Sequence, residues 1–127
     1  MNQNPLFDDD AASVARDFDQ TILSGILDIG DDAMRRDLCA QLLSDFRRMT
    51  AGLDESEPVM VSKIAHEIKG LASTIGAQRL AALAQTLHHS AEQVSAGALA
   101  VLVLSVSQEM DRVVSVLEAA ERASLRP

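Results

Sequence analysis

His66 is the residue of this chain whose setting best suits covalent chemistry. It lies within residues 61–77, VSKIAHEIKGLASTIGA, where apolar side chains recur every three or four positions. On a helix that turns by about 100° per residue, those apolar side chains fall opposite His66. We therefore expect the imidazole to project into solvent from the middle of an amphipathic helix. A neutral imidazole is a competent nucleophile near pH 7, because its unperturbed pKa is about 6.5.

The residues beside His66 suit an anionic substrate. Lys69 lies one turn away, within about 60° of His66 on the helical wheel, and could hold an anion beside the imidazole. Gly70 costs about 1 kcal/mol relative to Ala inside a helix, which suggests that a partner approaches the backbone closely there. Ser62 and Ser73 complete this predicted solvent face. A nucleophilic imidazole beside an ammonium group indicates phosphoryl transfer through phosphohistidine.

The charge around His66 differs from that of the whole chain. The net charge is −8, yet basic side chains outnumber acidic ones between residues 59 and 90. The charged residues of this segment are Lys63, Glu67, Lys69 and Arg79. We interpret them as a basic island around the imidazole.

Five segments show the apolar spacing of amphipathic helices, and they must position His66. We expect helices at residues 10–27 (or from 17), 32–53, 58–75, 77–93 and 98–123.

Single residues in and around these segments carry further expectations. We expect Phe18 inside the first helix, and Met34 in the apolar stripe of the second. Cys39 adjoins that stripe as a buried, inert thiol. We expect helices to end at Gly30, Gly76 and Gly97. Asp31 or Asp32 should cap the second helix, and Asp54 or Ser56 should cap the third, with Pro58 in its first turn.

The composition favours an all-α fold. Of 127 residues, 47% are apolar but only 2% are aromatic, and there are three prolines, which is a poor make-up for a β-sandwich or barrel. Four long helices with short connections predict an antiparallel up-down four-helix bundle, with the short additional N-terminal helix across one end. We expect residues 1–9 to be a flexible tail and residues 10–124 to form the bundle.

The charge and the apolar runs exclude several classes of partner. A pI of about 4.7 disfavours nucleic acids and anionic membranes, since both would repel the chain. No stretch reaches the roughly 18 apolar residues of a membrane span, and the N-terminus lacks the pattern of a secretory signal. Cys39 cannot form an internal disulfide, which fits a reducing compartment. We therefore expect a cytoplasmic protein.

The third segment resembles the signature of the histidine-containing phosphotransfer (Hpt) domain family, roughly A-H-x-[LI]-K-G-x-[AS]-x-x-[LIV]-G-[AL]. This chain has Ala65-His66-Glu67-Ile68-Lys69-Gly70, followed by Ala72 and Ile75-Gly76-Ala77. The helical layout is similar over about residues 10–123. Leu71 departs from the family's usual Ser or Ala.

The resemblance implies a role for each site residue. His66 would be the phosphoacceptor, at Nε2, Lys69 would neutralise phosphate charge, and Gly70 would leave room for the partner. His88 stands where the family often has Gln or Glu touching the active imidazole, and we hypothesise that it orients His66.

The resemblance also implies the partners. Response-regulator receiver domains would exchange phosphate with this chain, and a hybrid sensor histidine kinase is a second candidate. Any Mg²⁺ would belong to the receiver, so we expect no cofactor and no metal here, no kinase or ATPase activity, and a monomer.

Two other interpretations stay open. A helical bundle of this composition could bind receivers, or act as an adaptor, without exchanging phosphate. A sensor-kinase hairpin fits less well, because Gly70-Leu71 stands where that family continues to proline. A zinc-protease helix is excluded because Gly70 occupies the place of its second histidine.

Overall fold

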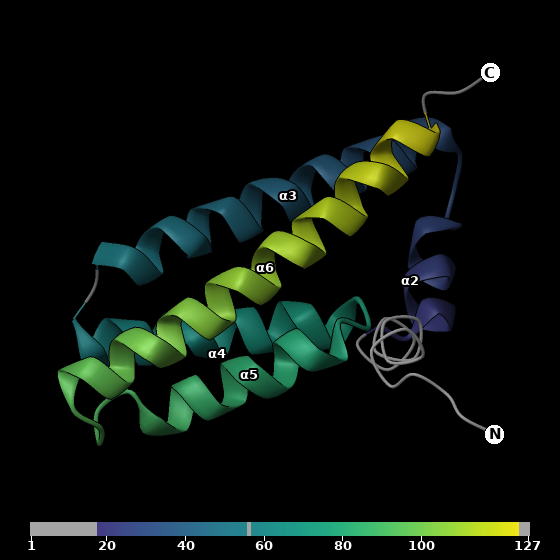
Figure 1. The fold of residues 1–127 in the computed structure, drawn as a ribbon. Helices are drawn as coiled ribbons and strands as arrows, with labels where there is room; N and C mark the ends of the chain where they lie inside the picture. The colour runs from purple at the N-terminus through teal and green to yellow at the C-terminus, as the bar shows by residue number, and fades with distance from the viewer. Residues whose placement is uncertain (1–17, 56, 125–127) are drawn as a thin grey trace, which may run out of the picture.

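The described part of the chain is helical. The computed structural model describes residues 18–55 and 57–124, so the predicted tail and the segment 10–17 lie outside it. The helices in this part are α2 (Gln20–Leu27), α3 (Asp32–Glu55), α4 (Pro58–Thr74), α5 (Gln78–Ser90) and α6 (Ala96–Ser124) (Figure 1). The predicted all-α class and the four long helices are confirmed.

The long helices pack into one bundle. α4 packs most extensively against α5, and α3 packs against α6. In addition, α5 contacts α6 and α3 contacts α4. Large, fully buried side chains come from all four long helices and from Ile75, which directly follows α4. They are Phe46, Ile68, Ile75, Leu80, Leu87, Met110, Leu117, Val61, Val106, Val113 and Cys39. Burial raises the pKa of the Cys39 thiol, as expected of an inert cysteine. None of the helices described is long and apolar enough to cross a membrane.

The first helix begins later than the periodicity predicts. The Asp19 carboxylate accepts hydrogen bonds from the backbone N–H groups of Thr21 (3.0 Å) and Ile22 (3.2 Å), so it caps α2. Phe18 therefore lies outside the helix, and it forms an isolated antiparallel bridge with Ala77. The prediction that Phe18 is helical is wrong, although its side chain is buried.

Other helix ends depend on their capping groups. Asp31 caps α3 as predicted, through a 2.9 Å bond from the N–H of Met34. Met34 itself is 54% exposed rather than part of the apolar stripe, because it lies in the first turn and covers Gly30.

The ends of α4 and α6 differ from prediction. Glu57 is the residue before α4, and Pro58 lies in the first turn. Asp54 therefore does not cap this helix. Ser56, the other predicted cap, lies outside the described residues. Gly97 does not end the fourth helix. The Ser95 hydroxyl accepts a 3.2 Å bond from the N–H of Ala98, and Gly97 lies in the first turn of α6.

Gly76 ties α2 to the end of α4. Its φ of +82° is in the left-handed region, where glycine is favoured. The N–H of Asp19 donates a 2.8 Å bond to the Gly76 carbonyl. A Cβ at position 76 would lie 2.8 Å from the Asp19 carbonyl oxygen and 3.1 Å from Cβ of Ile22. α2 therefore lies across the α4–α5 end, as Figure 1 shows.

We predict that Gly76→Ala lowers the free energy of unfolding by about 1–3 kcal/mol, because alanine is strained at positive φ and its methyl group meets backbone. Urea unfolding would measure the change. Gly97→Ala is the matched control, since its added methyl meets no atom of the described residues within 4 Å. Equal stability of Gly76→Ala and the wild type would contradict this account of the α2 attachment.

Candidate functional site

His66 lies on the exposed side of α4, as the periodicity predicts. The opposite side of the helix is held in the core by Val61, Ala65, Ile68 and Ala72. Within the described part of the chain, neither ring nitrogen of His66 has a hydrogen-bond partner. The imidazole is therefore presented from a packed helix with both nitrogens open to a reactant.

Among the described residues, the ring that contacts His66 is that of His88 on α5. The two ring centroids are 5.0 Å apart and the ring planes are tilted by 44°. His88 is half-buried, whereas His89 is exposed and contacts the Gln85 side chain. The structure thus brings His88 beside His66, where an orienting residue must lie, and turns His89 away from the core.

Ser62 corrects the prediction made from the helical wheel. The wheel predicts Ser62 on the solvent face, but the residue is only 8% exposed because α5 covers that flank of α4. Its hydroxyl lies 2.9 Å from the His88 carbonyl oxygen and 3.0 Å from Nδ1 of His88. Nδ1 also lies 2.9 Å from the Ser62 carbonyl oxygen. The sequence could not reveal these contacts, which join residues 26 positions apart.

Two lysines lie one turn before and one turn after His66. Lys69 is half-buried and Lys63 is exposed, and within residues 18–55 and 57–124 neither has an ion-pair partner. The Glu67 carboxylate lies 3.6 Å from the Arg48 guanidinium on α3. That acidic side chain is thus partly offset by a cation that the sequence analysis missed, which leaves the face around His66 positive.

Arg79 does not belong to the basic island. Its guanidinium lies 3.4 Å from the carboxylate of Glu109 on α6, which is buried and also bound by Arg112 at 3.1 Å. The expectation that Arg79 adds to the charge around His66 is wrong, because a charged partner from another helix engages it.

Gly70 is exposed, and a Cβ built on it would meet nothing within 4 Å. Packing among residues 18–55 and 57–124 therefore does not require glycine at position 70. Glycine makes a helix about 1 kcal/mol less stable than alanine at the same position. No contact among the described residues explains why glycine occupies position 70.

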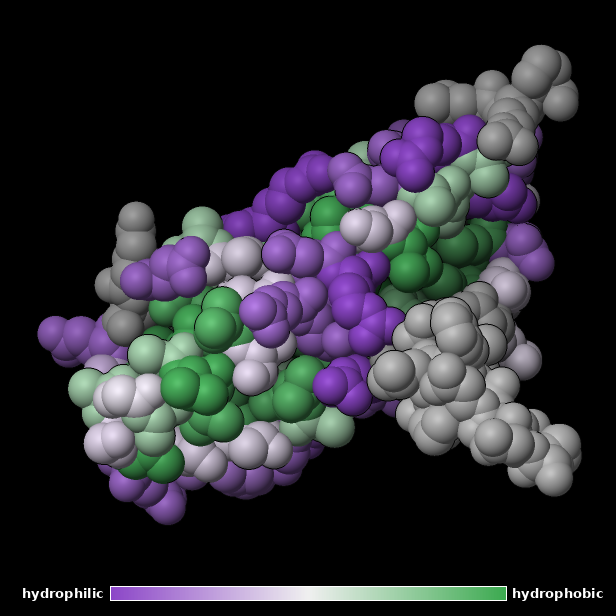
Figure 2. All heavy atoms as spheres, viewed as in Figure 1, coloured by the Kyte–Doolittle hydropathy of each residue, from purple (hydrophilic) through white to green (hydrophobic). Residues whose placement is uncertain are grey.

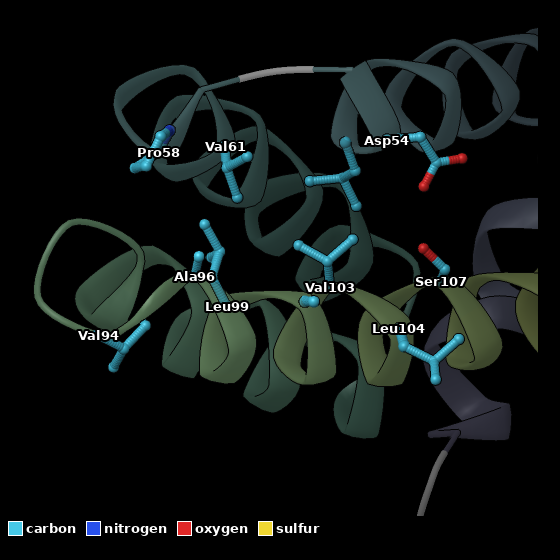
Figure 3. Close-up of a pocket in the computed structure, with 11 residues that line it drawn as sticks. Asp54, Pro58, Val61, Val94, Ala96, Leu99, Val103, Leu104 and Ser107 are labelled. Carbon is cyan, nitrogen blue, oxygen red and sulfur yellow. The ribbon is translucent and has the colours of Figure 1, made fainter.

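A cavity of about 830 Å³ lies away from His66, between α3, α4 and α6 (Figure 3). Its lining is mostly apolar, with Asp54 and Ser107 at one end. Figure 2 shows the accompanying apolar patch over the N-terminal half of α6. The face around His66 is thus distinct from this apolar cavity.

The described residues contain no group of three or more His, Cys, Asp or Glu side chains that could hold a metal ion. The expectation that the chain needs no metal or cofactor stays a prediction. The His66 face offers an open nucleophile, an adjacent ammonium group and an unobstructed backbone. That combination suits attack on a phosphoryl group carried by a large donor.

Comparison with known proteins agrees with this chemistry. The family model of the Hpt domain matches residues 33–122, which include α4, α5 and most of α3 and α6. Searches of curated proteins and of solved structures gave no significant match. The matched region covers well over half of the chain, so this protein belongs to the Hpt domain family, whose members act in phosphotransfer within His–Asp phosphorelays.

Proposed function

We propose that this chain is a histidine phosphotransfer protein of a multistep phosphorelay. His66 accepts a phosphoryl group from the aspartate of a receiver domain, or from a kinase, and passes it to another receiver. The observation that carries the proposal is the exposed imidazole of His66 on a packed helix, within the region matched to the family. Among the described residues, neither this ring nor the lysines on either side of it have a hydrogen-bond or ion-pair partner.

The transfer is an in-line displacement. An unprotonated ring nitrogen of His66, which we propose to be Nε2, attacks phosphorus, an N–P bond forms, and the P–O bond to the receiver's aspartate breaks. The aspartate leaves as a carboxylate, and the reverse reaction loads another receiver. The Lys69 ammonium stabilises charge on the transferring group, while Mg²⁺ and the other catalytic groups belong to the receiver.

The fold supplies a fixed direction of attack. We propose that the four long helices form the family's antiparallel up-down bundle, in which successive helices are joined by short connections (Figure 1). Rotating α4 to move His66 would expose Ile68, and burying a side chain of this size stabilises a fold by about 1.5–3 kcal/mol. The imidazole therefore meets the donor already oriented, which lowers the entropic part of the barrier.

Electrostatics favours a receiver as the partner. The family's receivers have acidic active sites, and Lys63 and Lys69 present two positive charges beside His66. Complementary charge of this kind accelerates encounter more than it raises affinity. A hybrid sensor kinase as donor, a cytoplasmic location and a monomeric state stay predictions.

We predict that His66→Gln folds like the wild type but takes up no phosphate from phosphorylated receivers. Gln retains polarity at an exposed position but lacks a nucleophilic nitrogen. Mass spectrometry and an acid-labile, alkali-stable label would report phosphohistidine. His89→Gln, at an exposed histidine on α5, is the matched control and should be labelled normally. A wild-type chain that binds receivers without becoming labelled would instead support an adaptor.

We predict that Lys69→Ala slows transfer from a phosphorylated receiver by about tenfold or more, because one preorganised charge contact is lost. Lys63→Ala should slow it by less than about threefold, since the exposed ammonium of Lys63 is more strongly screened by solvent. Rapid-quench kinetics would measure both. Equal rates for Lys69→Ala and the wild type would rule out the role of Lys69.

We predict that Gly70→Ala separates stability from transfer. The free energy of unfolding should rise by about 0.5–1 kcal/mol, because alanine favours the helix and its methyl group meets open space. Transfer from a receiver should slow, whereas labelling by the small donor phosphoramidate should not. Gly97→Ala, also unobstructed, should leave both reactions unchanged. Unimpaired receiver transfer in Gly70→Ala would refute the idea of close approach.

A further inference from the structure

Three polar contacts between Ser62 and His88 determine where the His88 ring carries its proton. The Ser62 hydroxyl has one hydrogen, which it donates to the His88 carbonyl oxygen at 2.9 Å. The Ser62 carbonyl oxygen, 2.9 Å from Nδ1 of His88, can only accept. All three contacts are satisfied when Nδ1 of His88 carries a hydrogen that it donates to the carbonyl and hydroxyl oxygens of Ser62.

These contacts stand at a point where backbone groups need partners. α5 ends at Ser90, so the His88 carbonyl lies in the last turn. Carbonyl oxygens there have no backbone N–H partner within the helix. The Ser62 hydroxyl satisfies the His88 carbonyl. The Ser62 carbonyl, four residues before His66, is the acceptor of the His66 N–H in the α-helical pattern, and its second lone pair is available to His88.

We propose that Ser62 is a positioning residue that holds His88 in the Nδ1–H form and thereby leaves Nε2 of His88 unprotonated, as a hydrogen-bond acceptor facing the site. The ring centroids of His88 and His66 are 5.0 Å apart. An N–H···N bond of about 3 Å between two imidazoles places their centres about 5 Å apart, which matches the observed separation of the His66 and His88 rings.

The consequence for transfer rests on the proposed function of His66. Once His88 accepts the hydrogen of one ring nitrogen of His66, the other nitrogen keeps its lone pair and becomes the nucleophile. When the N–P bond forms, the His66 ring gains positive charge, and the hydrogen bond to His88 strengthens. No proton has to leave during the step. Interactions that strengthen in this way accelerate the chemical step itself.

Nitrogen NMR of the His88 ring is the direct test. At alkaline pH, where imidazoles are neutral, wild-type His88 should show a protonated Nδ1 and an unprotonated Nε2. Free histidine prefers the opposite form, so the expected result is specific to this site. A protonated Nε2 on neutral wild-type His88 would overturn the proposal without any reference to activity.

Substitutions at Ser62 test the effect on transfer. Ser62→Ala keeps the backbone acceptor but removes the hydroxyl, so labelling of His66 by phosphoramidate should slow by about three- to tenfold, with a larger Nε2–H population on His88. Ser62→Thr retains the hydroxyl and should restore both readouts. Ser115→Ala, at an exposed serine of α6, should match the wild type.

The outcomes separate the two proposals. A labelled wild type, with Ser62→Ala unchanged in both rate and His88 tautomer, overturns the role of Ser62 and leaves the proposed function intact. A slow Ser62→Ala whose His88 tautomer is unchanged also overturns it, because the defect would then be structural. A wild type that takes no phosphate on His66 overturns the proposed function and, with it, the consequence for transfer.

Discussion

Burial of one side of α4 is the constraint on which the site depends. Ala65, Ile68 and Ala72 are fully buried at positions that repeat with the helical period, and the two alanines let neighbouring helices approach closely. Because the core fixes which side of α4 faces inward, it also fixes which side faces out. The side of α4 from which His66 projects is therefore a property of the packing.

The local charge of the site is decided by pairing between helices rather than by the net charge of −8. The positive charge of Arg48 on α3 partly offsets the negative charge of Glu67. Arg79 instead pairs with Glu109 on α6 and so does not add to the charge around His66. Exposed charges more than about 10 Å apart are largely screened at ordinary ionic strength, so an approaching receiver senses the nearby lysines more than the distant carboxylates. An acidic protein can thus present a positive face to an acidic partner.

Features that arise from helical periodicity could be predicted from the sequence, whereas features that depend on packing between helices could not. The four long helices, the outward His66 and the adjacent Lys69 are all set by spacing within a single segment. The contacts of Ser62 with His88, and the ion pairs of Glu67 and Arg79, join different helices and depend on how those helices are rotated. Errors at Phe18, Met34 and Gly97 lie at helix ends, where a capping side chain decides the boundary and periodicity carries little information.

Glycine occupies positions 76, 52 and 70 for different physical reasons. Gly76 is required by its positive φ and by the backbone of Asp19 against it. At Gly52, a Cβ would lie 2.9 Å from Cδ1 of Ile64, so glycine allows α3 and α4 to pack closely. Gly70 has neither reason, since its φ is helical and its surroundings among the described residues are open. A glycine that weakens a helix without serving any contact among the described residues is best explained by a contact with a partner. Gly70 lies four residues, about one helical turn, from the imidazole that such a partner would reach.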